Sequence, residues 1–282
     1  MIEVLTAGYF TSLQDGGRVG YRHLGVPLSG AMDSKAYTTA LALLPFRNDK
    51  CVFECTLLGP SFLLHQALRF VLTGGEMEAW LDDRPLETNR VYLAKRGSQL
   101  RLGKSKRGIR TYVRFEAELA VEKPLGSIAY FHPITPKIQL NDGDIFKLIN
   151  QPQYPVENPV HVKIDNHYLL ENELQVTPGP DWHQLNKDQQ HHILEEKHPI
   201  LSHSRMGYRL SGTTKIDAGT LFSQLVLPGM IQLTPGGELL IATADCQVTG
   251  GYLQILQLTP HSLACLVQKR EGENLTFQNI LD

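Results

Sequence analysis

Short alternating runs of apolar and polar residues dominate the chain and predict strands. In the stretch IRTYVRF, Ile109, Thr111, Val113 and Phe115 alternate with the residues between them, which is the period of a strand with one solvated face. Comparable runs, separated by Gly, Pro, Asn or Asp, occur at residues 68–73, 90–94, 99–103, 146–150, 238–244 and 253–258. Strands spaced in this way are typical of barrels and sandwiches, so the pattern predicts a mainly β fold.

Two segments have helical spacing instead. After the possible caps Asp33 and Ser34, residues 35–44 place apolar side chains three and four apart. A second helix is expected over residues 181–196, with Asp181 as its N-cap. Both are expected to lie on the surface of the β structure.

A stretch rich in proline and asparagine, NQPQYPVENPV at residues 150–160, predicts a linker. A boundary there divides the chain into two domains, residues 1–150 and 151–282. Hydrophobic residues make up 42% and charged residues 20% of the chain, which is ordinary for a folded globular protein.

The formal net charge of −2 gives no electrostatic case for nucleic acid or a membrane surface as a partner. No signal peptide or membrane span is visible in the sequence. The four cysteines form no CxxC pair, so a reduced, cytoplasmic protein is expected.

Two clusters of ionisable residues have ordinary explanations. Seven Lys or Arg residues lie between Lys95 and Arg110, and the turn-like KSKRG within them favours a solvated hairpin tip over an anion site. On HHILEE, His192 and Glu195 or Glu196 have the spacing of two metal ligands on one helix face. No third ligand or HExxH motif accompanies them, so a polar helix face is the preferred interpretation.

The sequence lacks the usual motifs of a self-sufficient hydrolase or ATPase. No G-x-S-x-G elbow is present. Cys246 stands beside Asp245, and a neighbouring carboxylate raises the pKa of a thiol, so a structural cysteine is favoured over a nucleophile. Neither phosphate-binding glycine motif occurs, so ATP, if used, is bound by another chain.

Three stretches carry residue types that packing alone does not explain. Residues 12–33 combine five glycines with Asp15, Arg18, Arg22, Ser29 and Asp33, as ligand loops often do, although a tight N-terminal meander is an equal alternative. Residues 204–212 contain Arg205 and Arg209, a pair suited to a carboxylate ligand. The third stretch is DCQVTGGY at residues 245–252.

Together these stretches resemble the biotin-dependent carboxyltransferase subunit family, which includes KipA, the C subunit of 5-oxoprolinase, and allophanate hydrolase subunit 2. The resemblance rests on QDGGRVGYRHLGVPLSGAMD, FECTLLGPSF, TPGPDW, SRMGYRLSG and GMIQLTPGGELLIATADCQVTGGY. The chain departs from the family pattern at Cys246, Val248 and Leu253 and over residues 114–127. These departures concern the catalytic residues more than the fold.

The resemblance implies two cyclophilin-like β-barrel domains and no cofactor bound by this chain alone. It also implies two partners, a larger, ATP-using A subunit together with a KipI-like B subunit. In 5-oxoprolinase such a complex opens the lactam of 5-oxo-L-proline to glutamate at the expense of ATP. Two alternatives stay open: a regulatory antagonist of KipI with no enzymatic activity, and a carboxyltransferase acting with biotin.

If the chain belongs to an amide-opening enzyme, the polar stretches supply a site for a small amide or lactam. Arg205 is the expected ligand of a substrate carboxylate. Asp245, Gln247 and Tyr252 are the expected catalytic residues, which orient the amide. The remaining substrate-binding residues expected from these stretches are Arg22, Ser29 and Asp33, together with Gly250 and Gly251, whose backbone N–H groups can approach a ligand closely.

Overall fold

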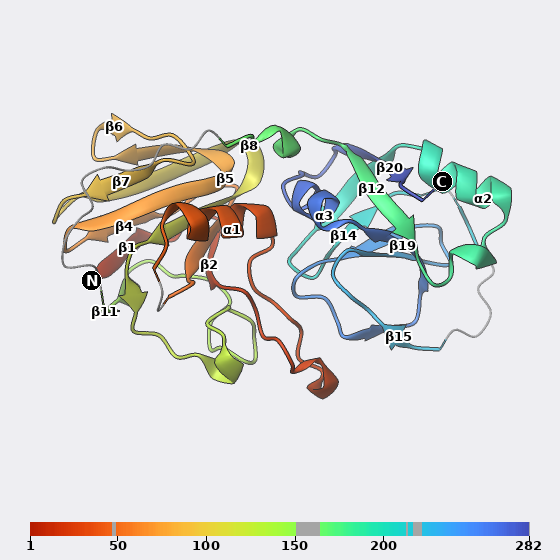
Figure 1. Ribbon diagram of the computed structural model, residues 1–282, viewed down its shortest axis with the longest axis horizontal. Coiled ribbons are helices and arrows are strands. Elements are labelled where there is room, and N and C mark those ends of the chain that lie inside the picture. The colour runs from red at the N-terminus through yellow and green to blue at the C-terminus, as the bar shows by residue number, and fades with distance from the viewer. Residues whose placement is uncertain (47–48, 151–163, 213, 217–221, 282) are drawn as a thin grey trace. The chain divides into compact units, whose positions relative to one another are not determined.

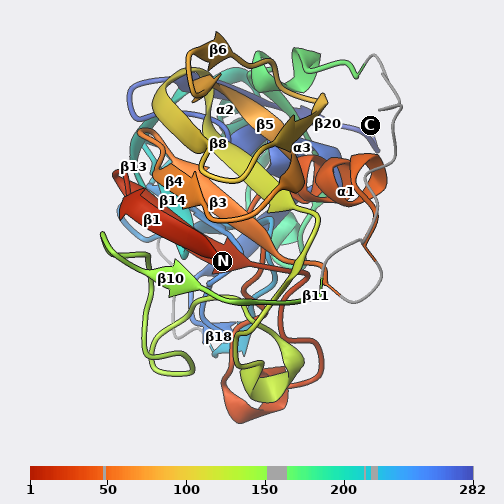
Figure 2. The ribbon, with the colours of Figure 1, turned by 90° about the vertical axis from the view of Figure 1, so that its left-hand side faces the viewer.

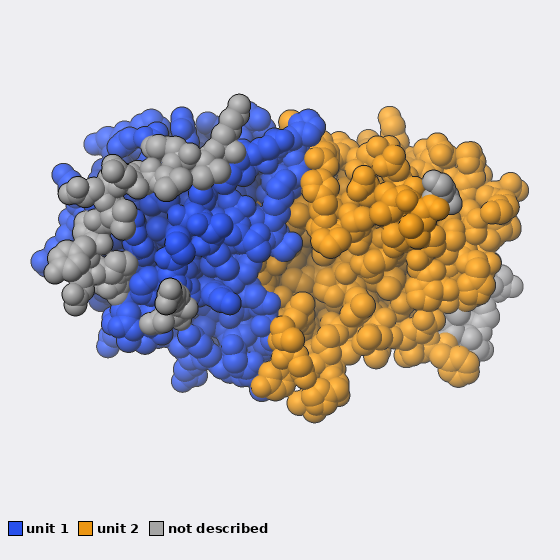
Figure 3. Space-filling view, in the orientation of Figure 1, with its two compact units in different colours: residues 1–18, 33–169 blue, residues 19–32, 170–282 orange. Residues whose placement is uncertain are grey.

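The computed structural model describes residues 1–46, 49–150, 164–212, 214–216 and 222–281. The chain forms two compact units (Figure 3): unit 1 contains residues 1–18 and 33–169, and unit 2 contains residues 19–32 and 170–282. Apart from Asn150, the linker expected at residues 150–160 lies outside the described residues. The boundary after residue 150 therefore stays a prediction.

Unit 1 is built on a nine-stranded sheet curled into half a barrel (Figures 1 and 2). Its strands follow the order β10-β1-β4-β8-β3-β2, and β5 pairs with β6, β7 and β8. Four phenylalanine rings fill its core, with centroids 5.1–5.8 Å apart. The strands of the sheet are β1 (Ile2–Thr6), β2 (Phe10–Gln14), β3 (Val52–Thr56), β4 (Ser61–Leu64), β5 (Leu68–Leu81), β6 (Arg84–Pro85), β7 (Val91–Ala94), β8 (Gln99–Phe115) and β10 (Ile145–Phe146), and a separate pair is formed by β9 (Glu118–Leu119) and β11 (Leu148–Asn150).

The turn expected at KSKRG, residues 104–108, is wrong. Strand β8 runs through it without a break and pairs with β5 on both sides of it. Register shifts between Gly74 and Ala79 of β5 absorb the irregular residues as bulges. The basic side chains there are exposed, as expected, and two of them pair with carboxylates of β5: Lys106 with Glu78 at 3.8 Å and Arg107 with Glu76 at 3.1 Å.

Unit 2 is a closed barrel of seven strands in the order β12-β19-β16-β17-β14-β13-β20. Strands β16 and β19 are buried along almost their whole length, since both faces of the barrel wall are covered there. The strands are β12 (Glu173–Pro178), β13 (His198–His203), β14 (Gly207–Leu210), β16 (Met230–Leu233), β17 (Leu239–Ala242), β19 (Leu253–Leu258) and β20 (Asn274–Asn279), and a separate two-stranded sheet contains β15 (Gln224–Leu225) and β18 (Thr249–Gly250). The mainly β prediction is confirmed.

Helix α1 (Ser34–Leu43) confirms the first predicted helix, and the carboxylate of Asp33 caps it by accepting a hydrogen bond from the Ala36 amide at 2.9 Å. Four short 3-10 helices accompany the α-helices: η1 (Arg22–Leu24), η2 (Pro124–Gly126), η3 (His167–Leu169) and η4 (Trp182–Gln184). No helix among the described residues is long and apolar enough to cross a membrane.

The second predicted helix starts later than expected. Helix α2 (Lys187–Glu195) is capped by Asn186, which forms a capping box with Gln189. Asp181 makes no cap, because its carboxylate accepts hydrogen bonds from the Gln254 amide at 2.9 Å and from the Gln184 side chain at 2.9 Å. Its cap assignment was therefore wrong. A third helix, α3 (Pro260–Leu266), was not predicted, although Thr259 and Pro260 form an ordinary N-terminal signal.

Candidate functional site

Eight of the nine predicted site residues belong to unit 2, and the glycine-rich stretch 19–32 is held there by backbone contacts. The Ser29 amide donates to the Ala244 carbonyl oxygen at 2.9 Å, and the Gly30 carbonyl oxygen accepts from Arg205 Nη2 at 2.6 Å. Ser29 and Gly30 both have positive φ, 56° and 84°, so the chain turns sharply at this point. This turn brings the first predicted stretch against the other two.

Arg205 and Asp245 form a bidentate ion pair. Arg205 Nε lies 2.8 Å from Asp245 Oδ2, and Nη2 lies 3.2 Å from Oδ1. The two side chains are only 11% and 8% exposed, and the Asp245 amide also donates to the Arg205 carbonyl oxygen at 2.8 Å. The charge of Arg205 is therefore neutralised within unit 2, and the ion pair fixes the orientation of the Asp245 carboxylate.

Arg22 has a different environment. Its Nη2 donates to the carbonyl oxygens of Val226 and Val248. Its Nε and Nη1 atoms are buried and donate to no oxygen or nitrogen of the described residues. No carboxylate of the described chain pairs with it either, so Arg22 has a positive charge and two donors without an oxygen acceptor.

Cys246 is fully buried, and its thiol interacts with the Arg22 guanidinium. Burial raises the pKa of the Cys246 thiol, the Arg22 guanidinium opposes this shift, and the Asp245 carboxylate adds to it. The thiol is therefore neutral near pH 7 and a weak hydrogen-bond acceptor. Cys246 packs with Val226, Met230 and Ala242, which agrees with the structural interpretation of this cysteine. Burial rather than Asp245 is the main cause that raises its pKa.

The two glycines of the last predicted stretch differ from each other. A Cβ atom at Gly250 would lie 2.9 Å from Gln232 Nε2 and 3.0 Å from Val226 Cγ2, whereas one at Gly251 would meet nothing within 4 Å. Glycine is therefore needed at position 250 because the side chains of Gln232 and Val226, both in unit 2, lie close to its Cα atom. Gln247 is exposed beside Gly250, and Tyr252 is 41% exposed.

Gln232 is a polar residue at this position that the sequence interpretation missed. It is 1% exposed, and its Nε2 has no hydrogen-bond partner among the described residues. Buried side-chain amides without a hydrogen-bond partner are uncommon in folded proteins, so this one suggests that a ligand or water molecule accepts from Gln232 Nε2. The sequence feature that could have identified it is a glutamine within the otherwise apolar strand sequence MIQL.

Asp33 is the one predicted site residue that belongs to unit 1. It is fully buried, and besides capping α1 its Oδ2 accepts a hydrogen bond from the Tyr168 hydroxyl at 2.7 Å. Arg209, which was paired with Arg205 as a carboxylate ligand, instead forms an exposed ion pair with Glu238, with Nε 2.9 Å from Oε2. The two arginines therefore have separate carboxylate partners.

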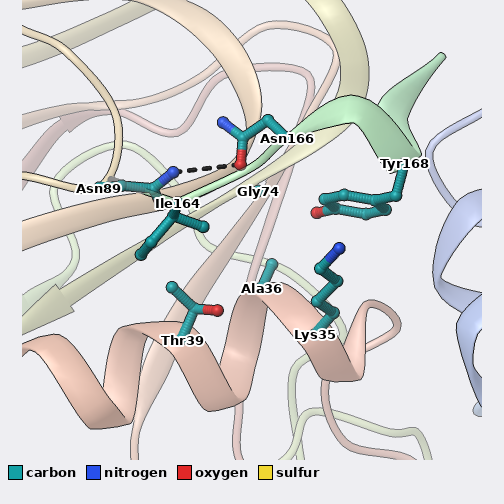
Figure 4. Close-up of a pocket in the computed structure, with 8 residues that line it drawn as sticks. All are labelled: Lys35, Ala36, Thr39, Gly74, Asn89, Ile164, Asn166 and Tyr168. Carbon is teal, nitrogen blue, oxygen red and sulfur yellow. Dashed lines mark hydrogen bonds between the residues drawn. The ribbon is translucent and has the colours of Figure 1, made fainter. Parts of the chain in front are cut away.

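Two cavities lined by described residues lie away from the candidate site. One in unit 1 (Figure 4) is bordered by Lys35, which lies 4.2 Å from the Tyr168 ring, and by the hydrogen-bonded pair Asn89 and Asn166. Its volume of about 10 Å³ holds about one water molecule. A groove of about 340 Å³ in unit 2 is lined by Glu173 and Glu195 among others, and two carboxylates disfavour an anionic ligand there.

A family model described as the carboxyltransferase domain, subdomains A and B, matches residues 24–279. The chain belongs to this carboxyltransferase domain family. The matched range includes Arg205, Asp245 and the residues around them. It also covers parts of both compact units, so the family assignment applies to the whole fold.

Known members and structures agree with the carboxyltransferase assignment. The chain is 28% identical to the C subunit of 5-oxoprolinase from Escherichia coli K12, over 98% of this chain and 90% of that protein. The crystal structure of the K. lactis urea amidolyase superposes with a TM-score of 0.84 at 26% identity, over 98% of this chain and 18% of that one. The crystal structure of TTHA0988 superposes with a TM-score of 0.87 at 24% identity, over 98% of this chain and 55% of that one, and supports the fold alone.

Proposed function

We propose that this carboxyltransferase-domain protein is the C subunit of an ATP-dependent 5-oxoprolinase-type complex that hydrolyses 5-oxo-L-proline to L-glutamate. Its similarity to a protein named as one subunit of 5-oxoprolinase supports a multi-subunit enzyme. The absence of a phosphate-binding motif in its sequence supports a division of labour in which a larger A subunit uses ATP. The third member of the complex is a KipI-like B subunit.

The observation that carries this proposal is that two donors of Arg22 have no oxygen or nitrogen acceptor among the described residues. A partly buried cation with no carboxylate partner gains from a ligand that supplies the negative charge. A substrate carboxylate suits a guanidinium whose Nε and Nη1 atoms lack an oxygen acceptor, because either N–H group can donate a charge-assisted hydrogen bond to it. Arg22 therefore takes the role that the sequence assigned to Arg205, whose own donors are engaged by Asp245.

The neighbouring residues suit the amide part of the same ligand. Asp245, fixed by Arg205, presents an oriented acceptor for a lactam N–H group. Gln232, Gln247 and the Tyr252 hydroxyl are the donors proposed for its carbonyl oxygen, with Ser29 and the backbone of Gly250 and Gly251 beside them. The catalytic part of the proposal thus remains with Asp245, Gln247 and Tyr252.

Reconstitution of the three subunits tests the proposal. We expect ATP hydrolysis that depends on added 5-oxoproline, and Arg22→Gln should raise the KM for 5-oxoproline at least about tenfold, or about 1.4 kcal/mol. Arg209→Gln is the matched control, because it removes an exposed arginine whose partner is Glu238. An unchanged KM in Arg22→Gln would contradict the role of Arg22, and normal growth of a gene-deletion strain on 5-oxoproline would contradict the whole proposal.

A regulatory role is the second candidate, in which the chain sequesters a KipI-like inhibitor without catalysis. The segment around β15 favours it, because Phe222, Leu225 and Leu227 are 83%, 53% and 43% exposed, as side chains at protein interfaces often are before binding. Binding to the KipI-like partner is common to both candidates. A complete three-subunit mixture with no 5-oxoproline-dependent ATP hydrolysis would favour regulation.

A carboxyltransferase reaction with biotin is the third candidate, and the family description and the similarity to urea amidolyase favour it. This reaction needs a biotinylated partner protein. A pull-down with this chain, probed with streptavidin, tests for one. A biotinylated protein that co-purifies in stoichiometric amount would support this candidate over the other two.

A further inference from the structure

Glu171, His261 and Cys265 of unit 2 bring together a carboxylate, an imidazole and a thiol, and none of them belongs to the candidate site. One ligand atom from each lies within 4.8 Å of the other two. His261 Nε2 is 2.7 Å from Glu171 Oε2, and Cys265 Sγ is 3.7 Å from the same oxygen. These residues are the one such group of three or more His, Cys, Asp or Glu ligands in the described part of the chain.

The fold holds these three residues on well-anchored segments. His261 and Cys265 are four residues apart on α3, so both point to the same side of the helix. The helix is fixed to the barrel by Ser262, whose Oγ accepts a hydrogen bond from the Gln175 amide of β12 at 2.7 Å. Glu171 lies just before β12, next to Asn172, whose carbonyl oxygen accepts from the Thr276 amide of β20 at 3.1 Å. Little backbone ordering is therefore required for a ligand to bind here.

We propose that Glu171, His261 and Cys265 bind Zn²⁺, with a water molecule as the fourth ligand. A set of one nitrogen, one sulfur and one oxygen donor suits Zn²⁺, whereas Mg²⁺ and Ca²⁺ require oxygen ligands. With bonds of about 2.0–2.3 Å, ligand atoms of a tetrahedral zinc site lie about 3.3–3.8 Å apart. The distance between Cys265 and Glu171 already fits this range.

The distance between His261 and Glu171 must increase by about 0.6 Å to reach the same range. Both side chains can move, because they are 45% and 31% exposed. Cys265 is fully buried, so the ion enters from the side of His261, where solvent supplies the fourth ligand. On binding, the Cys265 thiol releases its proton to solvent and the thiolate forms the bond to zinc.

A buried lysine next to the trio limits the affinity. Lys269 is 1% exposed and interacts electrostatically with Glu171 and Cys265. Its positive charge competes with a dication for these two ligands. Lys269→Met should therefore increase the affinity for Zn²⁺, and a decrease would contradict the proposed position of the ion.

Metal binding by the purified, metal-free full-length protein tests the proposal. We expect one Zn²⁺ per chain in competition with a chromophoric chelator. Co²⁺ in its place should give the visible bands of a tetrahedral ion and a sulfur-to-cobalt charge-transfer band in the near ultraviolet. His261→Gln should weaken binding by at least about tenfold, since loss of a direct ligand costs more than loss of its supporting hydrogen bonds.

His65→Gln is the matched control. His65 Nε2 also lies 2.7 Å from a carboxylate, that of Glu3, but no third ligand among the described residues joins this pair. Equal loss of binding in His65→Gln and His261→Gln, no stoichiometric binding, or a Co²⁺ spectrum without the charge-transfer band would each overturn the proposal. Because the His261 side chain is half exposed, its variant should fold even if Cys265→Ser does not.

Discussion

Two arginines, the buried Arg114 of unit 1 and the partly buried Arg22 of unit 2, differ in how their guanidinium groups are hydrogen-bonded. Arg114 of unit 1 is 1% exposed, and its nitrogens donate to four backbone carbonyl oxygens, those of Leu44, Phe46, Cys51 and Asp49. Arg22 of unit 2 donates to two carbonyl oxygens through one nitrogen, and its other two nitrogens are buried without an oxygen or nitrogen partner among the described residues.

The two arginines therefore differ in hydrogen bonding as well as in exposure. All three nitrogens of Arg114 donate hydrogen bonds that tie β8 to the segment that follows α1, so its contribution is to stability. Two nitrogens of Arg22 have no oxygen or nitrogen acceptor among the described residues, and this is the basis of its proposed role in ligand binding. Arg205 resembles Arg114 in this respect, because Asp245 and Gly30 accept its hydrogen bonds.

The largest expected effect is on stability. Arg114→Met leaves four carbonyl oxygens without a donor, at a cost of about 1 kcal/mol or more each, so the free energy of unfolding of unit 1 should fall by at least about 3 kcal/mol. Arg22→Met should cost less than half of that. Urea unfolding measures both values, and equal losses would remove the distinction between the two arginines.

Each unit contains one tryptophan, which allows the two to be followed separately. Trp80 lies in β5 of unit 1 and Trp182 in η4 of unit 2. In the Trp182→Phe variant only Trp80 remains, so its fluorescence reports on unit 1. In the Trp80→Phe variant only Trp182 remains, so its fluorescence reports on unit 2. Arg114→Met should shift the transition reported by Trp80 more than that reported by Trp182.

Alkaline pH should also affect unit 1 more than unit 2. Burial is the main cause that raises the pKa of the Cys51 and Cys55 thiols of unit 1, and it raises that of Cys246 in unit 2. Because these pKa values are higher in the folded than in the unfolded chain, stability is retained below the unfolded thiol pKa of about 8.5 and falls as the pH rises above it.

The expected slope is about 1.4 kcal/mol per pH unit for each such thiol. Unfolding of the single-tryptophan variants between pH 8 and pH 10 measures it for each unit. Cys51→Ala and Cys55→Ala should each make the slope of unit 1 less steep. A slope that neither variant changes would show that the thiols are not its cause.

The sequence was sufficient for the fold class, because alternation is a local property that the strands of both units share. It was insufficient where residues far away in the sequence determine the local structure. Residues 104–108 look like a turn, but pairing with the long strand β5 keeps them extended. Asp181 looks like a helix cap, but the Gln254 amide occupies its carboxylate.

The candidate site shows the same limit. The chemistry of Arg22, Arg205 and Asp245 is visible in the sequence, since polar residues and glycines interrupt apolar strands there. Which arginine is already paired is not visible, because Arg205 and Asp245 are forty residues apart. Gln232 was missed for a similar reason, since only the folded chain shows that its amide is buried beside Gly250 without a partner among the described residues.

The smallest expected effect separates two adjacent glycines of the site. Gly250→Ala would place a methyl group 2.9 Å from Gln232 Nε2 and 3.0 Å from Val226 Cγ2, so Gln232 must shift, at a cost of about 1 kcal/mol. Gly251→Ala meets nothing within 4 Å and should leave stability nearly unchanged. If Gln232 binds the ligand, Gly250→Ala should also raise the KM for 5-oxoproline, while Gly251→Ala should not. A stability loss in Gly250→Ala with an unchanged KM would show that Gln232 supports packing alone, because its displacement would then leave ligand binding intact.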